Sequence, residues 1–226
     1  MSLSIIIPVL NEESLIASSL LRLQPMRRNG VELIVVDGGS VDATVEHARP
    51  LADHVVLSPK GRGRQMNAGS HNARGDILLF LHADTYLPPD ADRLIAHGLA
   101  HSRRCWGRFD VVIAPKTALL AVVEAMMNLR SRLSGIATGD QAIFVECSVF
   151  RAIGGYREIA LMEDIELCQR LKRISRPLCL RARVSTSPRR WLEHGVVRTI
   201  LLMWRLRLAY FLSADPQQLA KRYPHG

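Results

Sequence analysis

The feature that most constrains the fold is a regular alternation of short apolar runs and helix-like segments in the first 90 residues. Four runs are rich in β-branched and aliphatic side chains: SIIIPV, ELIVVD, HVVLS and DILLFL, at 4–9, 32–37, 54–58 and 76–81. Helix-like segments separate them, at 12–23, 41–49 and 64–73. Strands that alternate with helices are typical of βαβ units, so this pattern predicts a parallel sheet.

Polar side chains follow three of these runs, at the points where the strands are expected to end. They are Asn11, Asp37 and Asp84, the last of which follows the fully apolar run at 78–81. In an open parallel sheet, ligands bind outside the carboxyl ends of the strands. The sequence therefore predicts that these three side chains line one cleft.

The second half of the chain is less regular. Strands are expected at 109–113 and 142–145, and helices at 117–133 and from MEDIELCQRLKR at 162–173. No internal repeat or low-complexity linker interrupts the chain, and 226 residues with 48% hydrophobic content can build one core. We expect a single domain, with a soft internal boundary near residue 90.

The positive charge is concentrated at the end of the chain. The formal charge is +9, and residues 165–226 hold 13 Lys and Arg against three acidic residues, a balance of +10. Such a segment favours an anionic partner, for example a diphosphate or an acidic membrane surface. Because only 5% of residues are aromatic, the chain offers few platforms for stacked bases, and we expect no nucleic-acid partner.

The apolar segment at 195–212, GVVRTILLMWRLRLAYFL, is interrupted by Arg198, Arg205 and Arg207. Its longest uninterrupted apolar stretch, at 200–204, is far shorter than the ~20 residues that a membrane-spanning helix needs. Two interpretations remain open. The segment is either a helix packed on its own domain or a helix lying in a membrane interface.

The cysteines and the N-terminus predict a cytoplasmic location. The four cysteines, at 105, 147, 168 and 179, show no CxxC spacing, which favours free thiols in a reducing compartment. The start, MSLSIIIPVLNEE, has no basic leader, and Pro8 interrupts its short apolar stretch. If the apolar segment at 195–212 is interfacial, the protein would lie at the inner face of the membrane.

The common phosphate-binding loops are excluded. In GRGRQMNAG, Gly61 and Gly63 fit a GxGxxG pattern, but Met66 stands where the third glycine belongs, and no Walker A pattern occurs. A cleft lined by acids can instead hold a diphosphate through a divalent cation. Mg²⁺ and Mn²⁺ prefer oxygen ligands and bridge carboxylates to phosphate oxygens.

Six motifs, in order, resemble an inverting glycosyltransferase of family 2 with the GT-A fold: SIIIPVLNEE, VVDGGSVDAT, LLFLHADT, GDQAIFV, GGYREIALMEDIEL and SPRRW. The resemblance covers about residues 4–191. Its RRW portion is similar to a small bacterial subgroup found beside radical-enzyme (radical-SAM) and selenium-related genes. The resemblance implies an α/β, Rossmann-like three-layer sandwich with a mainly parallel sheet and a C-terminal helical extension. Within one domain, 1–226, it implies a nucleotide-binding half (1–90), an acceptor and catalytic half (91–191) and the extension (192–226).

The resemblance also assigns roles to single residues. Asp164 would be the general base that deprotonates the acceptor, with Glu163 beside it. Asp84 would hold Mn²⁺ or Mg²⁺ on the diphosphate, while Asp37 would bind the uracil or ribose and Arg64 the base or phosphates. The full set implied to bind the nucleotide-sugar is Pro8, Asn11, Glu12, Asp37, Arg64, Asp84, Asp140, Gln141, Arg190 and Trp191.

The sequence departs from the family pattern in two places. His82 replaces the first acid of the DxD motif, which leaves Asp84 as the main metal ligand, with His82 and His194 as further candidates. Ser187 stands where the QxxRW form of the family has glutamine. Contacts with the acceptor therefore cannot be carried over from processive members of the family.

Each candidate residue also has an ordinary structural explanation. Asp37 precedes two glycines, which is a turn signal. Asp84 could cap the following segment, and Glu163 and Asp164 could simply favour the start of a helix. Arg62 alone is best explained as a solvated loop charge. Trp191 could be a core residue as well as a platform for the acceptor.

The leading hypothesis is therefore metal-dependent, inverting transfer of a sugar from a nucleotide diphosphate, with a UDP-sugar expected, to a hydroxyl or lipid-linked acceptor. Such a site needs positive charge at the departing diphosphate and a base at the acceptor. A sugar-phosphate nucleotidyltransferase is a second hypothesis, although PVLNEE replaces its glycine- and arginine-rich loop. A non-catalytic module that binds nucleotide-sugars or a membrane surface is a third.

Overall fold

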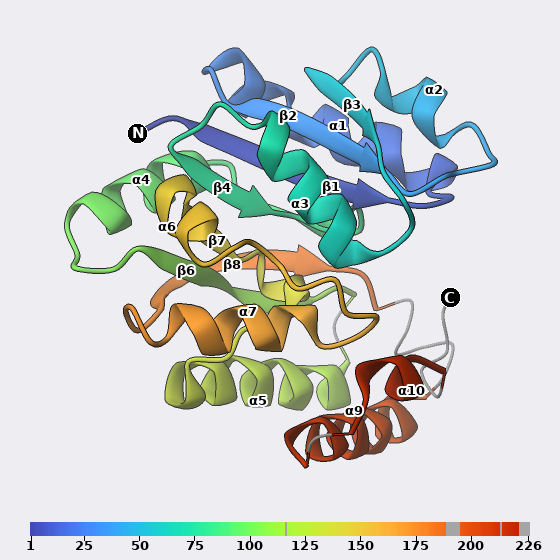
Figure 1. Ribbon diagram of the computed structural model, residues 1–226, viewed down its shortest axis with the longest axis vertical. Coiled ribbons are helices and arrows are strands. Elements are labelled where there is room, and N and C mark those ends of the chain that lie inside the picture. Colours follow the sequence, from blue (N-terminus) through green and yellow to red (C-terminus); the bar gives the residue numbers. More distant parts are fainter. Residues whose placement is uncertain (116, 189–194, 213, 222–226) are drawn as a thin grey trace.

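An eight-stranded sheet, covered by helices on both faces, runs through the computed structural model (Figure 1). The structure describes residues 1–115, 117–188, 195–212 and 214–221. The strand order is β3-β2-β1-β4-β7-β6-β8-β5. The predicted α/β architecture of three layers with a mainly parallel sheet is confirmed. Whether the chain divides functionally near residue 90 stays a prediction.

The first half of the chain is built as expected from parallel βαβ units. Its strands are β1 (Leu3–Val9), β2 (Glu32–Asp37), β3 (His54–Leu57) and β4 (Ile77–Phe80). They are connected by α1 (Glu13–Arg28), α2 (Thr44–Ala48) and α3 (Arg62–Asn72). The parallel strands all end at one edge of the sheet, so the loops that follow β1, β2 and β4 lie at that edge.

The second half adds strands of both directions. It comprises β5 (Thr85–Tyr86), α4 (Ala91–Ala100), β6 (Trp106–Ile113), α5 (Ala118–Ser134), the 3-10 turn η1 (Gly139–Gln141), β7 (Phe144–Glu146), α6 (Cys147–Ala152), α7 (Glu163–Leu171) and β8 (Leu178–Thr186). Strand β7 is antiparallel to β4 and β6, whereas β8 is parallel to β6. Consequently η1, which precedes β7, and the end of β8 both lie at the edge where β4 ends.

The core lies on both faces of the sheet because the buried strands carry apolar side chains on each side. Alternate residues of β1 show this directly. Ile5 and Ile7 pack with α1, α2 and α4 on one face, whereas Ile6 packs with α3, α6 and α7 on the other. The sheet is therefore packed from both sides along its length, and a ligand can approach it at the edge where the strands end.

The C-terminal extension forms two helices, α9 (Val196–Phe211) and α10 (Pro216–Lys221). Leu206 and Leu219 are each 3% exposed and join the core on the α7 side of the sheet. Val196 and Ile200 pack against Leu120 of α5. Packing of this segment on its own domain, one of the two interpretations left open, is thus present. None of the described helices is long and apolar enough to cross a membrane.

Candidate active site

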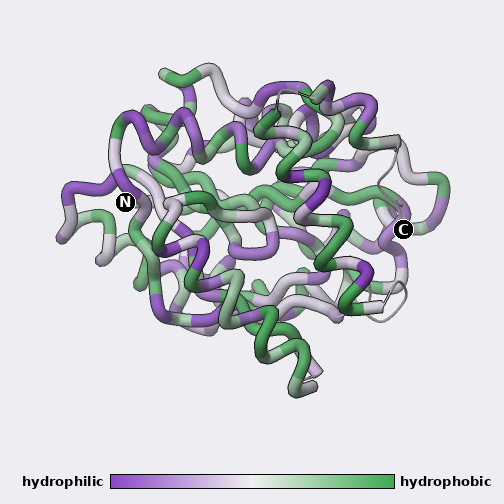
Figure 2. The backbone as a smooth tube through the Cα atoms, turned by 90° about the horizontal axis from the view of Figure 1, so that it is seen from below, coloured by the Kyte–Doolittle hydropathy of each residue, from purple (hydrophilic) through white to green (hydrophobic). Residues whose placement is uncertain are grey.

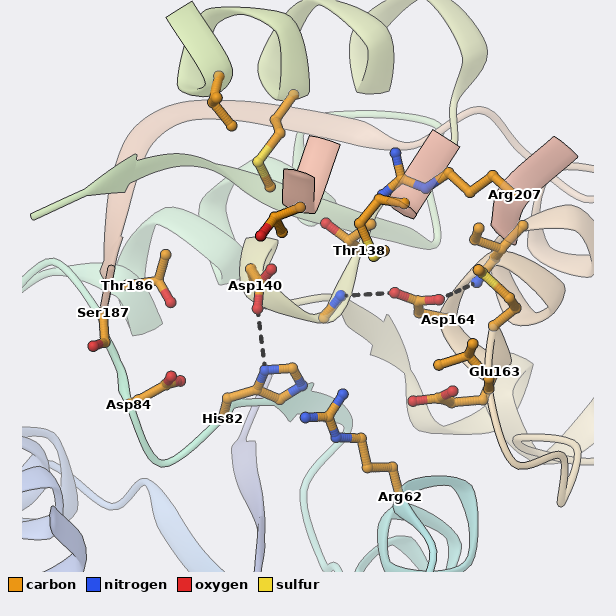
Figure 3. Close-up of a pocket in the computed structure, with 18 of the residues that line it drawn as sticks. Arg62, His82, Asp84, Thr138, Asp140, Glu163, Asp164, Thr186, Ser187 and Arg207 are labelled. Atoms are coloured by element: carbon orange, nitrogen blue, oxygen red, sulfur yellow. Dashed lines mark hydrogen bonds and ion pairs between the residues drawn. The ribbon is translucent and has the colours of Figure 1, made fainter. Parts of the chain in front are cut away.

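A cavity of about 460 Å³ opens at the edge of the sheet where β4 ends. Its lining comes from segments far apart in the sequence: the loops after β1 and β4, the turn η1, the start of α7 and the end of β8. Helices α5 and α9 add a further wall. Figure 3 shows Asp84 and Asp164 on opposite sides of the cavity, with His82 and Asp140 between them. The topology thus brings the HAD, GDQ and MED motifs together.

The structure divides the residues predicted from the sequence into three groups. Those that line the cavity are Pro8, Glu12, His82, Asp84, Asp140, Glu163 and Asp164. Those described but outside its lining are Asn11, Asp37, Arg64 and Gln141. Those that lie outside the described residues are Arg190, Trp191 and His194. The roles assigned to all of them remain predictions.

The loops after β1 and β2 are joined to each other. The Asp37 carboxylate is only 2% exposed and accepts hydrogen bonds from Gly39 N–H (2.9 Å) and Ser40 N–H (3.0 Å) as well as from the Ser40 hydroxyl. The amide oxygen of Asn11 accepts from Val41 N–H at 2.9 Å. These contacts show the turn-forming role that was one interpretation of Asp37.

Gly139 couples the HAD motif to the MED motif. A Cβ atom at this position would lie 2.4 Å from His82 Nε2, so only glycine allows this close approach. Gly139 N–H donates to Asp164 Oδ2 at 3.0 Å. The next residue, Asp140, places its Oδ1 3.4 Å from His82 Nδ1. The GDQ turn therefore fixes the relative positions of His82, Asp140 and Asp164.

Gln141 has a structural position behind the cavity. Its side chain is fully buried, and its Oε1 accepts from Thr138 N–H at 3.3 Å. Its Nε2 donates to Asn128 Oδ1 at 3.4 Å. These contacts hold η1 in place against α5, so Gln141 supports the turn that carries Asp140.

Asp164 lies in the first turn of α7, where the helix dipole favours a carboxylate. Its Oδ1 accepts from Ile165 N–H at 2.7 Å and its Oδ2 accepts from Gly139 N–H at 3.0 Å. An ionised carboxylate has about four acceptor sites, so both oxygens keep capacity for a further partner. The two backbone contacts orient Asp164 and leave both of its oxygens able to accept a hydrogen bond from a group in the cavity.

The neighbouring Glu163 is buried, with 8% of its surface exposed. Burial raises the pKa of Glu163, the adjacent Asp164 carboxylate raises it further, and Arg62 opposes the shift. Figure 3 shows the side chains of Glu163 and Arg62 pointing toward one another. Glu163 therefore holds a proton more readily than an ordinary glutamate does.

This raised pKa predicts a pH-dependent gain in stability for Glu163→Gln. A carboxyl group whose pKa is raised on folding supports the folded state below its ordinary pKa of 4.5, and this support is lost as the pH rises through the raised value. We therefore expect the variant to melt about 2–4 °C above the wild type at pH 8, corresponding to ~1 kcal/mol, and close to it at pH 4. Thermal melts at both pH values test this; an equal difference at pH 4 would contradict the assignment.

The two arginines at the start of α3 do not lie where the sequence led us to expect them. Arg62, interpreted from the sequence as a solvated charge, lines the cavity. Arg64, expected at the base or phosphates, donates from Nε to Glu158 Oε2 at 2.8 Å, and about half of each of these two side chains is exposed. On geometry, Arg62 is the better candidate for contact with a phosphate.

A second pair of arginines lies toward α5 and α9. Arg130 and Arg207 both line the cavity. Burial, together with the nearby charge of Arg207, lowers the pKa of Arg130 to about 10, which leaves it cationic at neutral pH. Within the described residues, Arg130 Nε and Nη2 are buried and have no hydrogen-bond partner. Buried donors without partners are costly, so Arg130 is a strong candidate for an anionic ligand.

The wall beside these arginines is apolar. It is formed by side chains of α5 and α9: Val123, Met126, Met127, Ile200, Met203 and Trp204. The cavity therefore has a polar end, with the carboxylates, and an apolar end. No sequence motif indicates this wall, because the α5 region is expected only as a helix and the α9 region only as an apolar segment.

Unusual backbone conformations lie beside the site. The non-glycine residues with positive φ within the described ranges are Asn11, Ala142 and Met162. Each belongs to a motif of the site: Asn11 precedes Glu12, Ala142 follows η1, and Met162 precedes Glu163. Such conformations cost ~1–3 kcal/mol and persist where the surroundings enforce them. They support the view that these loops are shaped for a ligand.

The site fits a metal ion that is held largely by its substrate. Within the described residues, no group of three or more His, Cys, Asp or Glu could hold a metal ion. Mg²⁺ commonly binds through one or two carboxylates plus substrate phosphates, and Asp84 supplies one carboxylate at the cavity wall. The remaining ligands would then come from a diphosphate.

Comparison with known families gives a match over most of the sheet. The family model described as Glycosyl transferase family 2 matches residues 4–146. This range includes β1 to β7 and the HAD and GDQ motifs, but ends before α7.

Two curated relatives are similar in sequence to more than half of this chain. The undecaprenyl-phosphate 4-deoxy-4-formamido-L-arabinose transferase of Pseudomonas fluorescens is 34% identical over 61% of this chain and 44% of its own. The succinoglycan biosynthesis protein ExoA of Rhizobium meliloti is 30% identical over 74% of this chain and 57% of its own. The chain thus spans about half the length of these relatives.

Solved structures share the fold at low sequence identity. S. aureus TarS residues 1–349 in complex with UDP-GlcNAc has a TM-score of 0.68 at 20% identity, covering 83% of this chain and 58% of the other. Glucosyl-3-phosphoglycerate synthase from Mycobacterium tuberculosis, in complex with Mn²⁺, UDP and glucosyl-3-phosphoglycerate, has a TM-score of 0.61 at 18% identity, covering 82% and 70%. These likenesses establish a common fold.

Proposed function

Because this chain belongs to glycosyltransferase family 2, we propose that it transfers a sugar from a nucleotide diphosphate to an acceptor within the cavity between Asp84 and Asp164. The observation that carries this proposal is that the two carboxylates, which come from different halves of the chain, line one cavity from opposite sides (Figure 3). The resemblance to a bacterial subgroup beside radical-enzyme and selenium-related genes stays a prediction.

The proposed donor is a UDP-sugar whose diphosphate lies beside Asp84 and Arg62. Structures of the same fold have been determined with UDP or UDP-GlcNAc, and some of these also hold Mn²⁺ or Mg²⁺, which supports this choice. A bound Mn²⁺ or Mg²⁺ would neutralise the charge that develops on the departing diphosphate. Asp84 would hold that ion, and the guanidinium of Arg62 would add a second positive charge near the phosphates.

On the other side of the cavity, Asp164 would act as general base. The acceptor hydroxyl gives its proton to the Asp164 carboxylate as its oxygen bonds to the anomeric carbon. The bond from that carbon to the β-phosphate oxygen breaks, and the electron pair leaves with the nucleoside diphosphate. Attack from the side opposite the leaving group inverts the configuration, which agrees with the positions of Asp84 and Asp164 across the cavity.

The proposed acceptor is lipid-linked and carries an anionic group. The apolar wall of α5 and α9 suits a hydrocarbon chain, while Arg130 offers two buried donors for a phosphate or carboxylate. A relative is named as an undecaprenyl-phosphate transferase, which supports an acceptor of this class. The reaction would then take place in the cytoplasm, at the inner face of the membrane.

Arg130→Met tests the acceptor assignment. We expect the KM for an anionic lipid acceptor to rise at least about 10-fold, because one charge-assisted hydrogen bond contributes ~1.5–3 kcal/mol. The variant should also melt at or above the wild-type temperature, since it removes buried donors that lack partners. Initial rates at varied acceptor concentration and thermal melts measure the two effects.

The control for Arg130→Met is Arg132→Met, in the same helix, whose guanidinium pairs with Asp110. This variant should lose stability and keep the acceptor KM. Equal acceptor KM values in Arg130→Met and the wild type would remove Arg130 from the acceptor site.

Hydrolysis and binding of the donor test the proposed function directly. UDP-, GDP- and dTDP-sugars are compared by thermal shift with and without Mn²⁺, and slow UDP release is measured without acceptor. Release of UDP from a UDP-sugar supports transfer. Release of pyrophosphate from UTP and a sugar phosphate would instead indicate a nucleotidyltransferase, and binding without any turnover would indicate a non-catalytic module.

A further inference from the structure

The exposed residues of helix α5 all carry apolar side chains, while its polar residues are buried or only partly exposed. Its exposed residues are Ala118, Leu119, Ala121, Val122, Ala125, Met126, Leu129 and Leu133. A helix on the surface of a globular protein normally turns charged and polar residues toward water. The outer face of α5 therefore lacks the polar side chains that a surface in contact with water would carry.

Helix α9 carries a second exposed apolar stripe. Its members are Val197, Leu201, Trp204, Leu208 and Phe211, each between 55% and 62% exposed. Their spacing of three and four residues places them on one face of the helix. We call the exposed apolar faces of α5 and α9 together the apolar platform.

The two faces belong to one side of the molecule. Val196 and Ile200 of α9 pack against Leu120 and Val123 of α5. Figure 1 shows both helices at the bottom of the molecule. Figure 2 views the chain from below, and long stretches of the chain on this side are coloured as hydrophobic residues. The apolar platform therefore has the exposed apolar surface of two helices rather than of one. Large exposed apolar patches mark interaction sites.

The exposed charges on the two helices have one sign. Helix α9 contains no acidic residue, and its exposed charged side chains are Arg198 and Arg205. The acidic residue of α5, Glu124, is 8% exposed and accepts from Ile113 N–H at 2.7 Å. An apolar surface flanked by arginines, with no exposed carboxylate on either helix, complements an anionic lipid surface.

We propose that the apolar platform docks on an anionic lipid bilayer, and that the cavity between α5 and α9 receives the acceptor from that bilayer. Docking on the bilayer is inferred from the composition of the two helices. Entry of the acceptor from the bilayer rests on the proposed function. It is supported by the fact that the platform continues into the cavity, because Met126 and Trp204 belong to both. A lipid head group could therefore enter the site without its chain leaving the apolar phase.

The test is co-sedimentation of the full chain with vesicles of phosphatidylcholine alone or mixed with phosphatidylglycerol at about 3:1. We expect the wild type to bind the mixed vesicles, and the double variant Leu129→Glu/Leu208→Glu to bind at least about 10-fold more weakly, because it loses two exposed leucines and adds two negative charges. Both positions lie outside the cavity lining, so the fold and donor hydrolysis should be retained. Leu57→Glu, at an exposed leucine of the distant edge strand β3, is the matched control and should bind like the wild type.

Three outcomes would overturn the proposal. The double variant could bind the mixed vesicles as well as Leu57→Glu does, or the wild type could bind neither kind of vesicle. The wild type could also form a dimer in solution that the double variant does not, which would show that a second copy covers the platform. Vesicle binding without donor hydrolysis would leave the platform assigned and reject only the proposed function.

Discussion

Asp164→Asn is expected to lower sugar transfer by about 10²–10⁴-fold while donor binding is retained, because a positioned general base contributes that much to such reactions. The asparagine side chain cannot accept the acceptor proton. It also places an amide N–H group near a backbone donor, either Gly139 or Ile165. Initial transfer rates and titration with the UDP-sugar measure the two effects separately.

Two controls separate loss of the base from loss of the fold. Repulsion between the new side-chain amide and the backbone N–H that it faces would lower the free energy of unfolding by ~1–3 kcal/mol. A thermal melt must therefore show that the variant is folded at the assay temperature. Glu163→Gln removes the neighbouring carboxylate and should keep most of the transfer. If Glu163→Gln loses transfer and Asp164→Asn does not, the base is Glu163.

The first half of the fold could be predicted because its strands are buried on both faces. Such strands have continuous apolar runs, and ELIVVD was predicted at 32–37 and forms β2 at Glu32–Asp37. Helix ends were less accurate. The helix expected at 12–23 continues to Arg28 as α1, since Pro25 does not end it.

Several elements of the second half had no counterpart in the sequence prediction: β5, α4, α6 and β8. Strand β8, LCLRARVST, alternates with arginines and is only partly buried along most of its length, so it lacks a continuous apolar run. Its place between β6 and β5 is decided by pairing with distant residues. The antiparallel insertion of β7 between β4 and β6 likewise depends on contacts that no local pattern encodes.

The residues of the candidate site also divide into those that a local motif predicts and those that only the folded structure reveals. Asp84 and Asp164 lie in recognisable motifs at the ends of elements, and the resemblance to family 2 assigned both to one site. The strand pattern also predicted that Asn11 and Asp37 share a cleft with Asp84, but these two residues lie outside the lining of the cavity.

Arg62 and Arg64 belong to the same helical turn, so only the fold determines which of them faces the cavity. Arg130 has no motif at all. Its importance follows from buried donors without described partners, which only coordinates can reveal.

Because His82 replaces an acid, the HAD motif has only one carboxylate that could bind a metal ion. The first acid of the DxD pattern is replaced by an imidazole, which Asp140 contacts and which packs against Gly139. This position therefore connects the HAD and GDQ motifs. Asp84 remains as the carboxylate of the HAD motif available for an ion on the diphosphate.

Asp84→Asn is accordingly expected to abolish the tightening of UDP binding by Mn²⁺ and to lower transfer by about 10²–10³-fold, the usual effect of removing one electrostatic contact to a developing charge. The fold should be unaffected, because the described partner of Asp84 Oδ1 is the Thr85 hydroxyl at 3.3 Å, to which an amide oxygen can also bind. Thermal shift with UDP, with and without Mn²⁺, and initial rates measure the change. Asp140→Asn is the matched control at the same cavity wall, and it should keep the Mn²⁺ effect. An equal Mn²⁺ effect in Asp84→Asn and the wild type would exclude Asp84 as a metal ligand.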